Sequence, residues 1–176
     1  MPQHIFYDSF AKVTFAFWNK YPNSACKHVR HVDIIDRQIS NNGLLITKRI
    51  LACENNNSIS IGWLKRMIPD MVFTIEVSVV DPKNQTMLIR SRNLSSQSIM
   101  QMDESCVYKA LCPKTTLYKQ EIKFHATVNS LVNSKIENYA MAHAKEKSTI
   151  GIQAMEDILF MHRLLKNQRA CANTCD

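Results

Sequence analysis

Apolar positions recur at helical spacing near the start of the chain. Phe10, Val13 and Phe17 fall three or four residues apart, which predicts one buried face of a short helix capped by Asp8 or Ser9. The residue before a proline is pushed out of the α region, so the Tyr21-Pro22 step ends this helix near Lys20. The pattern therefore places a lysine on the last turn of a helix, beside a hydrophobic interior.

The same spacing returns over residues 131–168 and predicts a long C-terminal helix in which Gly151 is a point of bending or breakage. Its apolar stripe consists of Ile136, Tyr139, Ala140, Met155, Ile158, Leu159 and Leu165.

Strand patterns fill most of the chain between the two helices. Residues 3–7 predict an opening strand. Residues 28–39 are rich in Val and Ile with apolar groups on both faces, which favours a central strand. The turn signal Asn41-Asn42-Gly43 leads into a return strand over residues 44–53, on which Lys48 and Arg49 point to opposite faces. One of these two cations must point inward, and such a side chain usually extends to an edge.

Further strands are predicted at residues 72–80, 86–94 and 99–111, and residues 118–128 alternate most clearly between apolar and polar. No helical pattern separates these strands, so hairpins join them and the sheet is antiparallel. The expected fold is α+β: a sheet of about seven strands, a short N-terminal helix and a long C-terminal helix in the START-like, or helix-grip, layout. Residues 1–170 form the domain and residues 171–176 a short tail.

Residues 54–71 interrupt the strand pattern. Apolar residues there surround two cations, and Pro69 ends the segment. The segment could be an amphipathic helix packed on the core, or a mobile lid whose indole and cations suit the headgroup boundary of a bilayer. The residues concerned are Ile61, Trp63, Leu64, Lys65, Arg66, Met67 and Ile68.

Charge and cysteine content narrow the function classes. The net charge of +7 favours a polyanionic partner, either nucleic acid or an anionic membrane. The basic residues are dispersed and form no recognition motif, so we expect no nucleic-acid binding. No apolar run approaches the length of a membrane-spanning helix. The six cysteines lack zinc spacing, and the pair Cys171 and Cys175 lies in the tail, with its redox state open.

Cys26 with His28 or His31 is the one nucleophilic pair that the sequence suggests, and no third group orients it. We therefore expect no enzyme activity, no metal and no cofactor. Lys20 has two readings: a solvated lysine that interacts with the helix dipole, or a cation that binds an anion inside the fold.

Three sequence blocks, in order, resemble the signature of the PRELI domain family. They are Phe15-Ala16-Phe17-Trp18-Asn19-Lys20-Tyr21-Pro22-Asn23 with Lys27-His28-Val29, then Val79-Val80-Asp81-Pro82-Lys83-Asn84-Gln85-Thr86-Met87, then Arg92-Asn93-Leu94. The similarity runs from about Ile5 to about Leu165 and is greatest to the PRELI branch. The chain departs from much of the family at Cys53, where a basic residue often precedes the lid.

The resemblance implies a lipid-transfer protein that carries phosphatidic acid between the outer and inner mitochondrial membranes, one lipid per pocket, in support of cardiolipin synthesis. Phosphatidylserine transfer and an adaptor role without transfer are the alternatives. The implied partner is a small helical protein with twin Cys-x9-Cys motifs. The implied location is the intermembrane space, whereas the N-terminus shows no targeting segment and by itself favours the cytoplasm.

The resemblance also implies headgroup-binding residues. It places the family's cation at Lys20 and a second polar position at His28. Lys145 and Lys147 on the long helix are candidates for closing the phosphate site, with solvated helix lysines as the equally open reading. The lid residues named above would dock on the membrane.

Overall fold

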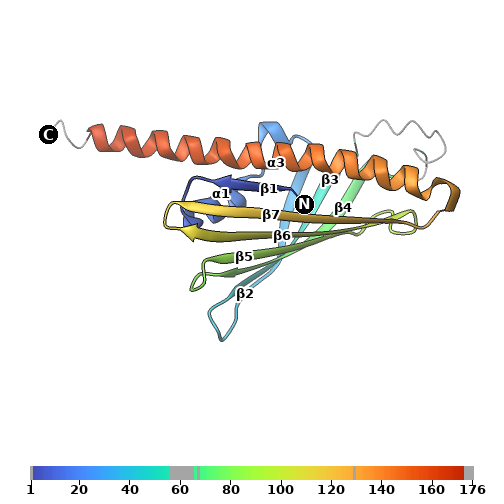
Figure 1. Ribbon diagram of the computed structural model, residues 1–176, viewed down its shortest axis with the longest axis horizontal. Helices are drawn as coiled ribbons and strands as arrows, with labels where there is room; N and C mark the ends of the chain where they lie inside the picture. The colour runs from blue at the N-terminus through green and yellow to red at the C-terminus, as the bar shows by residue number, and fades with distance from the viewer. Residues whose placement is uncertain (1, 56–65, 67, 129, 173–176) are drawn as a thin grey trace.

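A computed structural model describes residues 2–55, 66, 68–128 and 130–172 of the chain (Figure 1). In chain order the elements are β1 (Gln3–Phe6), α1 (Phe10–Asn19), the single 3-10 turn η1 (Ser24–Cys26), β2 (Val29–Ile39), β3 (Leu45–Glu54), β4 (Met71–Asp81), β5 (Thr86–Asn93), β6 (Met100–Cys112), β7 (Thr115–Ala126) and α3 (Ser130–Ala172).

The seven strands form one antiparallel sheet in the order β1-β7-β6-β5-β4-β3-β2. Strands β2 to β7 therefore lie in sequence order, and β1 returns to pair with β7, where Gln3 lies opposite Lys119 and Phe6 opposite Thr116. Helix α3 runs along one side of this sheet and extends past its edge at the C-terminal end (Figure 1). The predicted α+β architecture, with its two helices of unequal length, is confirmed.

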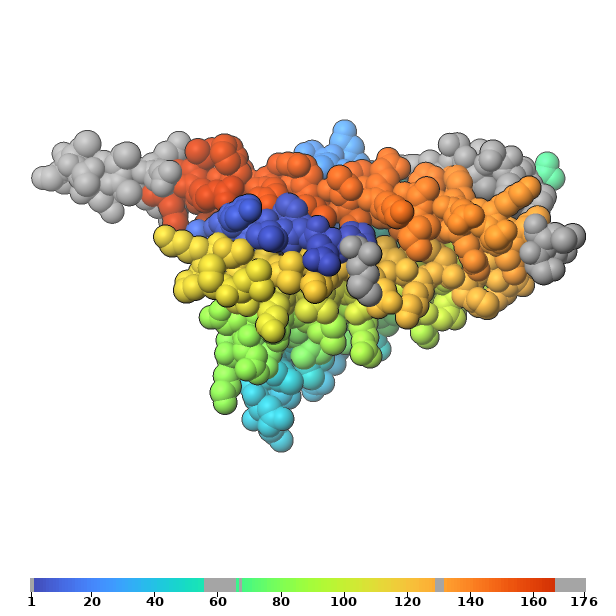
Figure 2. All heavy atoms as spheres, in the orientation of Figure 1, coloured from blue at the N-terminus to red at the C-terminus, as the bar shows by residue number. Residues whose placement is uncertain are grey.

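Two details of the predicted fold were wrong. Strand β2 lies at the edge of the sheet, and Ile39 at its end is 74% exposed. Apolar residues on both faces of a strand do not specify two neighbouring strands, and here the β2–β3 hairpin projects from the body on the side away from α3 (Figure 2). Helix α3 also continues unbroken through Gly151, because one glycine costs only about 1 kcal/mol in a helix that packs along most of its length.

The main core lies at one end of the molecule. There α1 packs between the sheet and α3, and Phe6 of β1 joins the same cluster. The buried side chains of this cluster include Phe6, Val13, Phe17, Met87, Tyr108, Tyr118, Met155 and Leu159. None of the described helices is long and apolar enough to cross a membrane.

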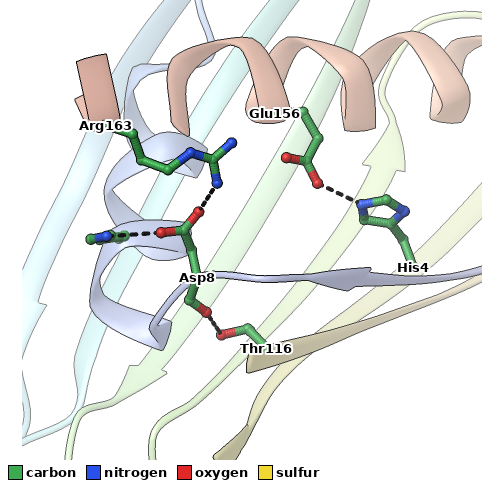
Figure 3. A network of polar contacts seen from close by, with 6 residues as sticks. His4, Asp8, Thr116, Glu156 and Arg163 are labelled. Carbon is green, nitrogen blue, oxygen red and sulfur yellow. Dashed lines mark hydrogen bonds and ion pairs between the residues drawn. The ribbon is translucent and has the colours of Figure 1, made fainter. Parts of the chain in front are cut away.

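Polar contacts fasten the C-terminal half of α3 to the first elements of the chain (Figure 3). The buried carboxylate of Asp8 accepts hydrogen bonds from Lys12 Nζ, at 2.9 Å, and from Arg163 Nη1. His4 Nε2 lies 2.9 Å from Glu156 Oε1. Ser9 occupies the N-cap position of α1, but its side chain makes no capping hydrogen bond.

Candidate functional site

A cavity of about 390 Å³ lies between the sheet and α3. This volume falls within the range of roughly 300–1,000 Å³ that is usual for ligand pockets. Helix α3 lines it with one face, on which contacts recur every three or four residues: Ile136, Tyr139, Ala140, His143, Ala144, Lys147, Ser148, Gly151, Ile152 and Met155. Small side chains at Ala140, Ala144 and Gly151 leave space where larger ones would close the gap.

The wall formed by the sheet is mainly apolar. Its apolar members come from the six strands β2 to β7 and include Val29, Leu51, Val72, Ile89, Ile99, Met100, Met102, Ile122 and Phe124, with Ile99 on the turn before β6. An ordinary α+β domain fills such a space with core side chains, since interiors pack closely. Here the main core ends at Met155 and Tyr108, which also line the cavity. The fold therefore holds a packed end and a hollow end, where a smaller cluster of Ile99, Ala126 and Ile136 is buried beside the cavity.

Lys20 is the cation at the packed end of the cavity. It is the C-cap residue of α1, is half-buried, and lines the cavity. Its Nζ lies 4.6 Å from the ring centre of Phe17 and 5.1 Å from that of Tyr21. Among the described residues, no carboxylate forms an ion pair with Lys20 and no acceptor forms a hydrogen bond with it. A half-buried ammonium without an acceptor is suited to bind an anion.

Burial works against the charge of Lys20, but its pKa is nevertheless raised. The charges of Tyr21 and Glu76 act in the opposite direction and outweigh both the burial and the repulsion from Arg49. Lys20 is therefore protonated throughout the physiological pH range.

Arg49 is the inward-pointing cation of β3, and it does not extend to an edge as expected. Its side chain is buried, and its Nε donates to Glu76 Oε1 at 2.6 Å, directly across the β3–β4 pair. Lys48 points to solvent. Glu76 lines the cavity and was not identified from the sequence, because its importance depends on a strand register that the sequence does not reveal.

The other predicted headgroup residues divide into two groups. His28 and Lys147 line the cavity with Lys20, and the charge of Lys147 acts on both His28 and Cys26. Burial and Lys147 lower the pKa of His28, so its imidazole is neutral at neutral pH. Lys145 is exposed and does not line the cavity, so it takes no part in the site that the structure assembles.

A second polar group in the cavity connects the sheet to α3. Gln120 Nε2 donates to Glu104 Oε1 at 2.5 Å, and Gln120 Oε1 accepts from Ser148 Oγ at 2.5 Å. All three residues line the cavity. The alternation of β7 could have indicated that Gln120 points inward, because it shares the parity of Tyr118 and Ile122.

Most of the predicted lid lies outside the described residues, namely Ile61, Trp63, Leu64, Lys65 and Met67. Of the other two, Arg66 is exposed, and Ile68 lines the cavity and packs against Ile99, Ala126 and Ile136. The choice between a packed helix and a lid stays a prediction.

The nucleophilic pair considered above is not activated. Burial raises the pKa of the Cys26 thiol, and His31 is exposed on β2. Within the described ranges, no three His, Cys, Asp or Glu side chains gather closely enough to hold a metal ion. The side chains of Cys171 and Cys175 lie outside the described part.

Comparison with known proteins gives a consistent result. The family model of the PRELI-like family matches residues 11–164. Protein UPS1, mitochondrial, of Saccharomyces cerevisiae is 34% identical over 88% of this chain and 92% of its own length. Human PRELI domain-containing protein 1, mitochondrial, is 30% identical over 89% of this chain and 73% of its own length.

Two solved structures share the fold at low sequence identity. The protein TTHA0849 from Thermus thermophilus aligns with a TM-score of 0.62 at 10% identity, over 92% of this chain and 96% of its own. The Zhui aromatase/cyclase from a Streptomyces species aligns with a TM-score of 0.59 at 9% identity, over 88% of each chain. At these identities the likeness shows the helix-grip fold alone.

Proposed function

The chain belongs to the PRELI-like family, a mitochondrial lipid-transfer family, and from this premise we propose that it carries phosphatidic acid between the outer and inner mitochondrial membranes. It acts in the intermembrane space, takes one lipid per cavity and supports cardiolipin synthesis. The observation that carries the proposal is Lys20, a protonated cation without an acceptor in the described chain, on the wall of a mainly apolar cavity.

The chemistry of phosphatidic acid matches this site. The lipid has two long acyl chains and one compact phosphate. Burying a methylene stabilises by about 0.8 kcal/mol in the cavity or in the bilayer alike, so the chains favour neither location and provide little selectivity. Selectivity therefore rests on the phosphate, which Lys20 attracts with Lys147 and the neutral His28 as further donors.

Phosphatidylserine transfer is the second candidate, and one observation favours it. The carboxylates of Glu76 and Glu104 line the same cavity as Lys20 and Lys147. The serine headgroup, which carries a phosphate, an ammonium and a carboxylate, would place its phosphate on a lysine and its ammonium on Glu104. An adaptor that binds its partner without transferring lipid is the remaining alternative.

Mass spectrometry of the lipid that copurifies with the protein tests these alternatives. The protein is coexpressed with a twin Cys-x9-Cys partner, which we propose as its heterodimer subunit, and wild type is compared with Lys20→Glu. Enrichment of phosphatidic acid that disappears in Lys20→Glu supports the proposal, and Lys145→Glu serves as a matched control with lipid retained. Enriched phosphatidylserine would shift the assignment to the second candidate, and no lipid in wild type would leave the adaptor.

Membrane docking through the segment around Trp63, Lys65 and Arg66 is part of the same proposal. Each basic residue contributes on the order of 1 kcal/mol near an anionic leaflet. Replacing these three residues by alanine should slow transfer between vesicles and weaken its dependence on anionic lipid. Unchanged transfer would exclude this docking segment.

A further inference from the structure

Two cations lie against the same aromatic ring at the packed end of the cavity. Lys20 Nζ is 4.6 Å and the Arg49 guanidinium carbon 4.7 Å from the ring centre of Phe17. Phe17 is almost completely buried, so the ring against which both charges lie is shielded from bulk solvent. Two like charges held this close in a poorly hydrated site repel one another. A negative charge must offset that repulsion, and the described residues offer Glu76.

Glu76 is bound to only one of the two cations. Its Oε1 accepts from Arg49 Nε at 2.6 Å, whereas no ion pair joins it to Lys20 among the described residues. The Nη2 atom of Arg49 is buried and has no hydrogen-bond partner in the described chain. A buried charged donor without an acceptor is costly, and a ligand anion at this end of the cavity would supply one.

Glu76 is the nearby group that can hold Lys20 charged at neutral pH. The groups that face Lys20 are Tyr21 and Cys26 beside α1, Arg49 on β3, Glu76 on β4 and Cys106 on β6. Burial raises the pKa of the Tyr21 phenol and the pKa of each of the two thiols. The phenol and both thiols are therefore neutral at neutral pH, which leaves Glu76 and Arg49 as the charged neighbours. Lys147, on α3, acts on Cys26 from the other side.

We propose that Glu76 is the resident counterion of the headgroup site, and that Arg49 is a positioning residue that holds Glu76 away from Lys20. This inference rests on the proposed function. In the empty cavity, the negative charge of Glu76 favours the protonated form of Lys20, although the two groups form no ion pair among the described residues. Because Arg49 retains the carboxylate, Lys20 stays open to a lipid phosphate instead of closing into an internal ion pair.

The arrangement explains how one lysine can select anions. Lys20, Arg49 and Glu76 together carry one net positive charge, so a single anionic group completes the neutralisation. A neutral or zwitterionic phosphate ester without excess negative charge leaves the site with its surplus cation. Selection for the anionic headgroup class therefore depends on Glu76 and Arg49 as well as on Lys20.

Transfer of a fluorescent phosphatidic acid from phosphatidylcholine vesicles, measured from neutral to alkaline pH, tests the counterion. Wild type should retain transfer until Lys20 loses its proton, above its reference pKa of 10.5. In Glu76→Gln, the charge of Tyr21 is the main one left to oppose burial and Arg49 at Lys20, and burial raises the pKa at which that phenol ionises. The pH of half-maximal transfer should then fall by about one unit or more.

Arginine at position 20 provides the matched rescue, because its guanidinium stays charged at every pH used and needs no counterion. Lys20→Arg/Glu76→Gln should show no alkaline loss, and its profile should match that of Lys20→Arg. A purely structural role of Glu76 predicts the opposite, since replacing Lys20 would not repair a damaged sheet. If Glu76→Gln fails to fold, Arg49→Met/Glu76→Leu removes both buried charges together and should still lose transfer at a lower pH than wild type, by less than Glu76→Gln because the repulsion from Arg49 is also gone.

The outcomes separate the two proposals. If wild type transfers phosphatidic acid and Glu76→Gln has the wild-type pH profile, the counterion proposal is wrong and the proposed function stands. The same conclusion follows if arginine at position 20 does not rescue. If wild type transfers no phosphatidic acid at any pH, the proposed function fails and the counterion fails with it.

Discussion

The two halves of α3 have different roles in the same fold. The C-terminal half, from Met155 to Arg163, lies on α1 and β1 and belongs to the main core and to the ion pairs of Figure 3. The N-terminal half, from Ile136 to Gly151, lies over the cavity. One helix thus provides a fixed end and a covering end. Stability and ligand binding are therefore separable along a single element, and substitutions can test this separation.

Leu159→Ala should produce the largest loss of stability, because it empties a fully packed position in the fixed half. Leu159 is 1% exposed, and such substitutions cost about 2–5 kcal/mol. Ile122→Ala is the matched control, since Ile122 already borders the cavity and its loss creates little new empty volume. The free energy of unfolding in urea measures both. Equal losses would remove the distinction between the packed and hollow ends.

Asp8→Asn should produce the next largest loss of stability, about 2 kcal/mol in the free energy of unfolding. The substitution keeps the shape of the side chain but removes the charge that binds Lys12 and Arg163. Asp157→Asn, at an exposed position of α3, is the control and should change stability by less than about 0.5 kcal/mol. The midpoints of thermal unfolding of the two variants measure this difference. If Asp8→Asn unfolds at the same temperature as wild type, the apolar core alone holds α3 in place.

Ser148→Ala should cost about 1 kcal/mol, because it removes the hydrogen bond between the covering half of α3 and Gln120. Hydrogen exchange of the backbone amides of α3 should increase near residue 148 and stay unchanged near residue 159. Thr149→Ala, whose hydroxyl bonds only within the helix, is the control. A uniform increase along α3 would contradict two separate halves.

Ala144→Phe should leave the free energy of unfolding within about 0.5 kcal/mol of wild type while abolishing lipid uptake. The larger ring enters the existing cavity and displaces no core side chain. Ala142→Phe places the same ring on an exposed position and should keep uptake. If mass spectrometry finds phosphatidic acid copurified with Ala144→Phe as with wild type, the lipid binds outside this cavity.

The periodicity of apolar residues predicted the helices and strands of this fold well, but it predicted less well which strands lie side by side. Alternation identified the strands because each face of a strand meets one environment. It could not identify the edge, since Ile34 and Ile35 of β2 are about half exposed without any compensating pattern. Likewise, Arg49 and Glu76 meet because of the register between β3 and β4. The sequence does not reveal this register, because the connection between the two strands, residues 55–70, is too long to be a tight hairpin turn that would determine it.

Helical phase could have separated the two lysines of α3. Residues on a helix turn by about 100° each, so Lys147 shares the face of Ala140, Ala144 and Gly151, whereas Lys145 lies nearly opposite. The family resemblance did not distinguish Lys145 from Lys147 as headgroup-binding candidates. Lys20 and His28 were located by the helix end and by the resemblance, and Glu76, Glu104 and Gln120 had no sequence signal beyond their inward parity.

The position of β1 also has a kinetic consequence. Its partner is β7, so residues near positions 3 and 119 must meet before the sheet is complete. Contacts this far apart in sequence form slowly, because a long loop must close before any pairing energy is gained. The N-terminal strand can therefore pair only once the chain through β7, which ends at Ala126, is available, and we expect a newly made molecule to complete its packed end, and the surroundings of the lysine beside it, only after that.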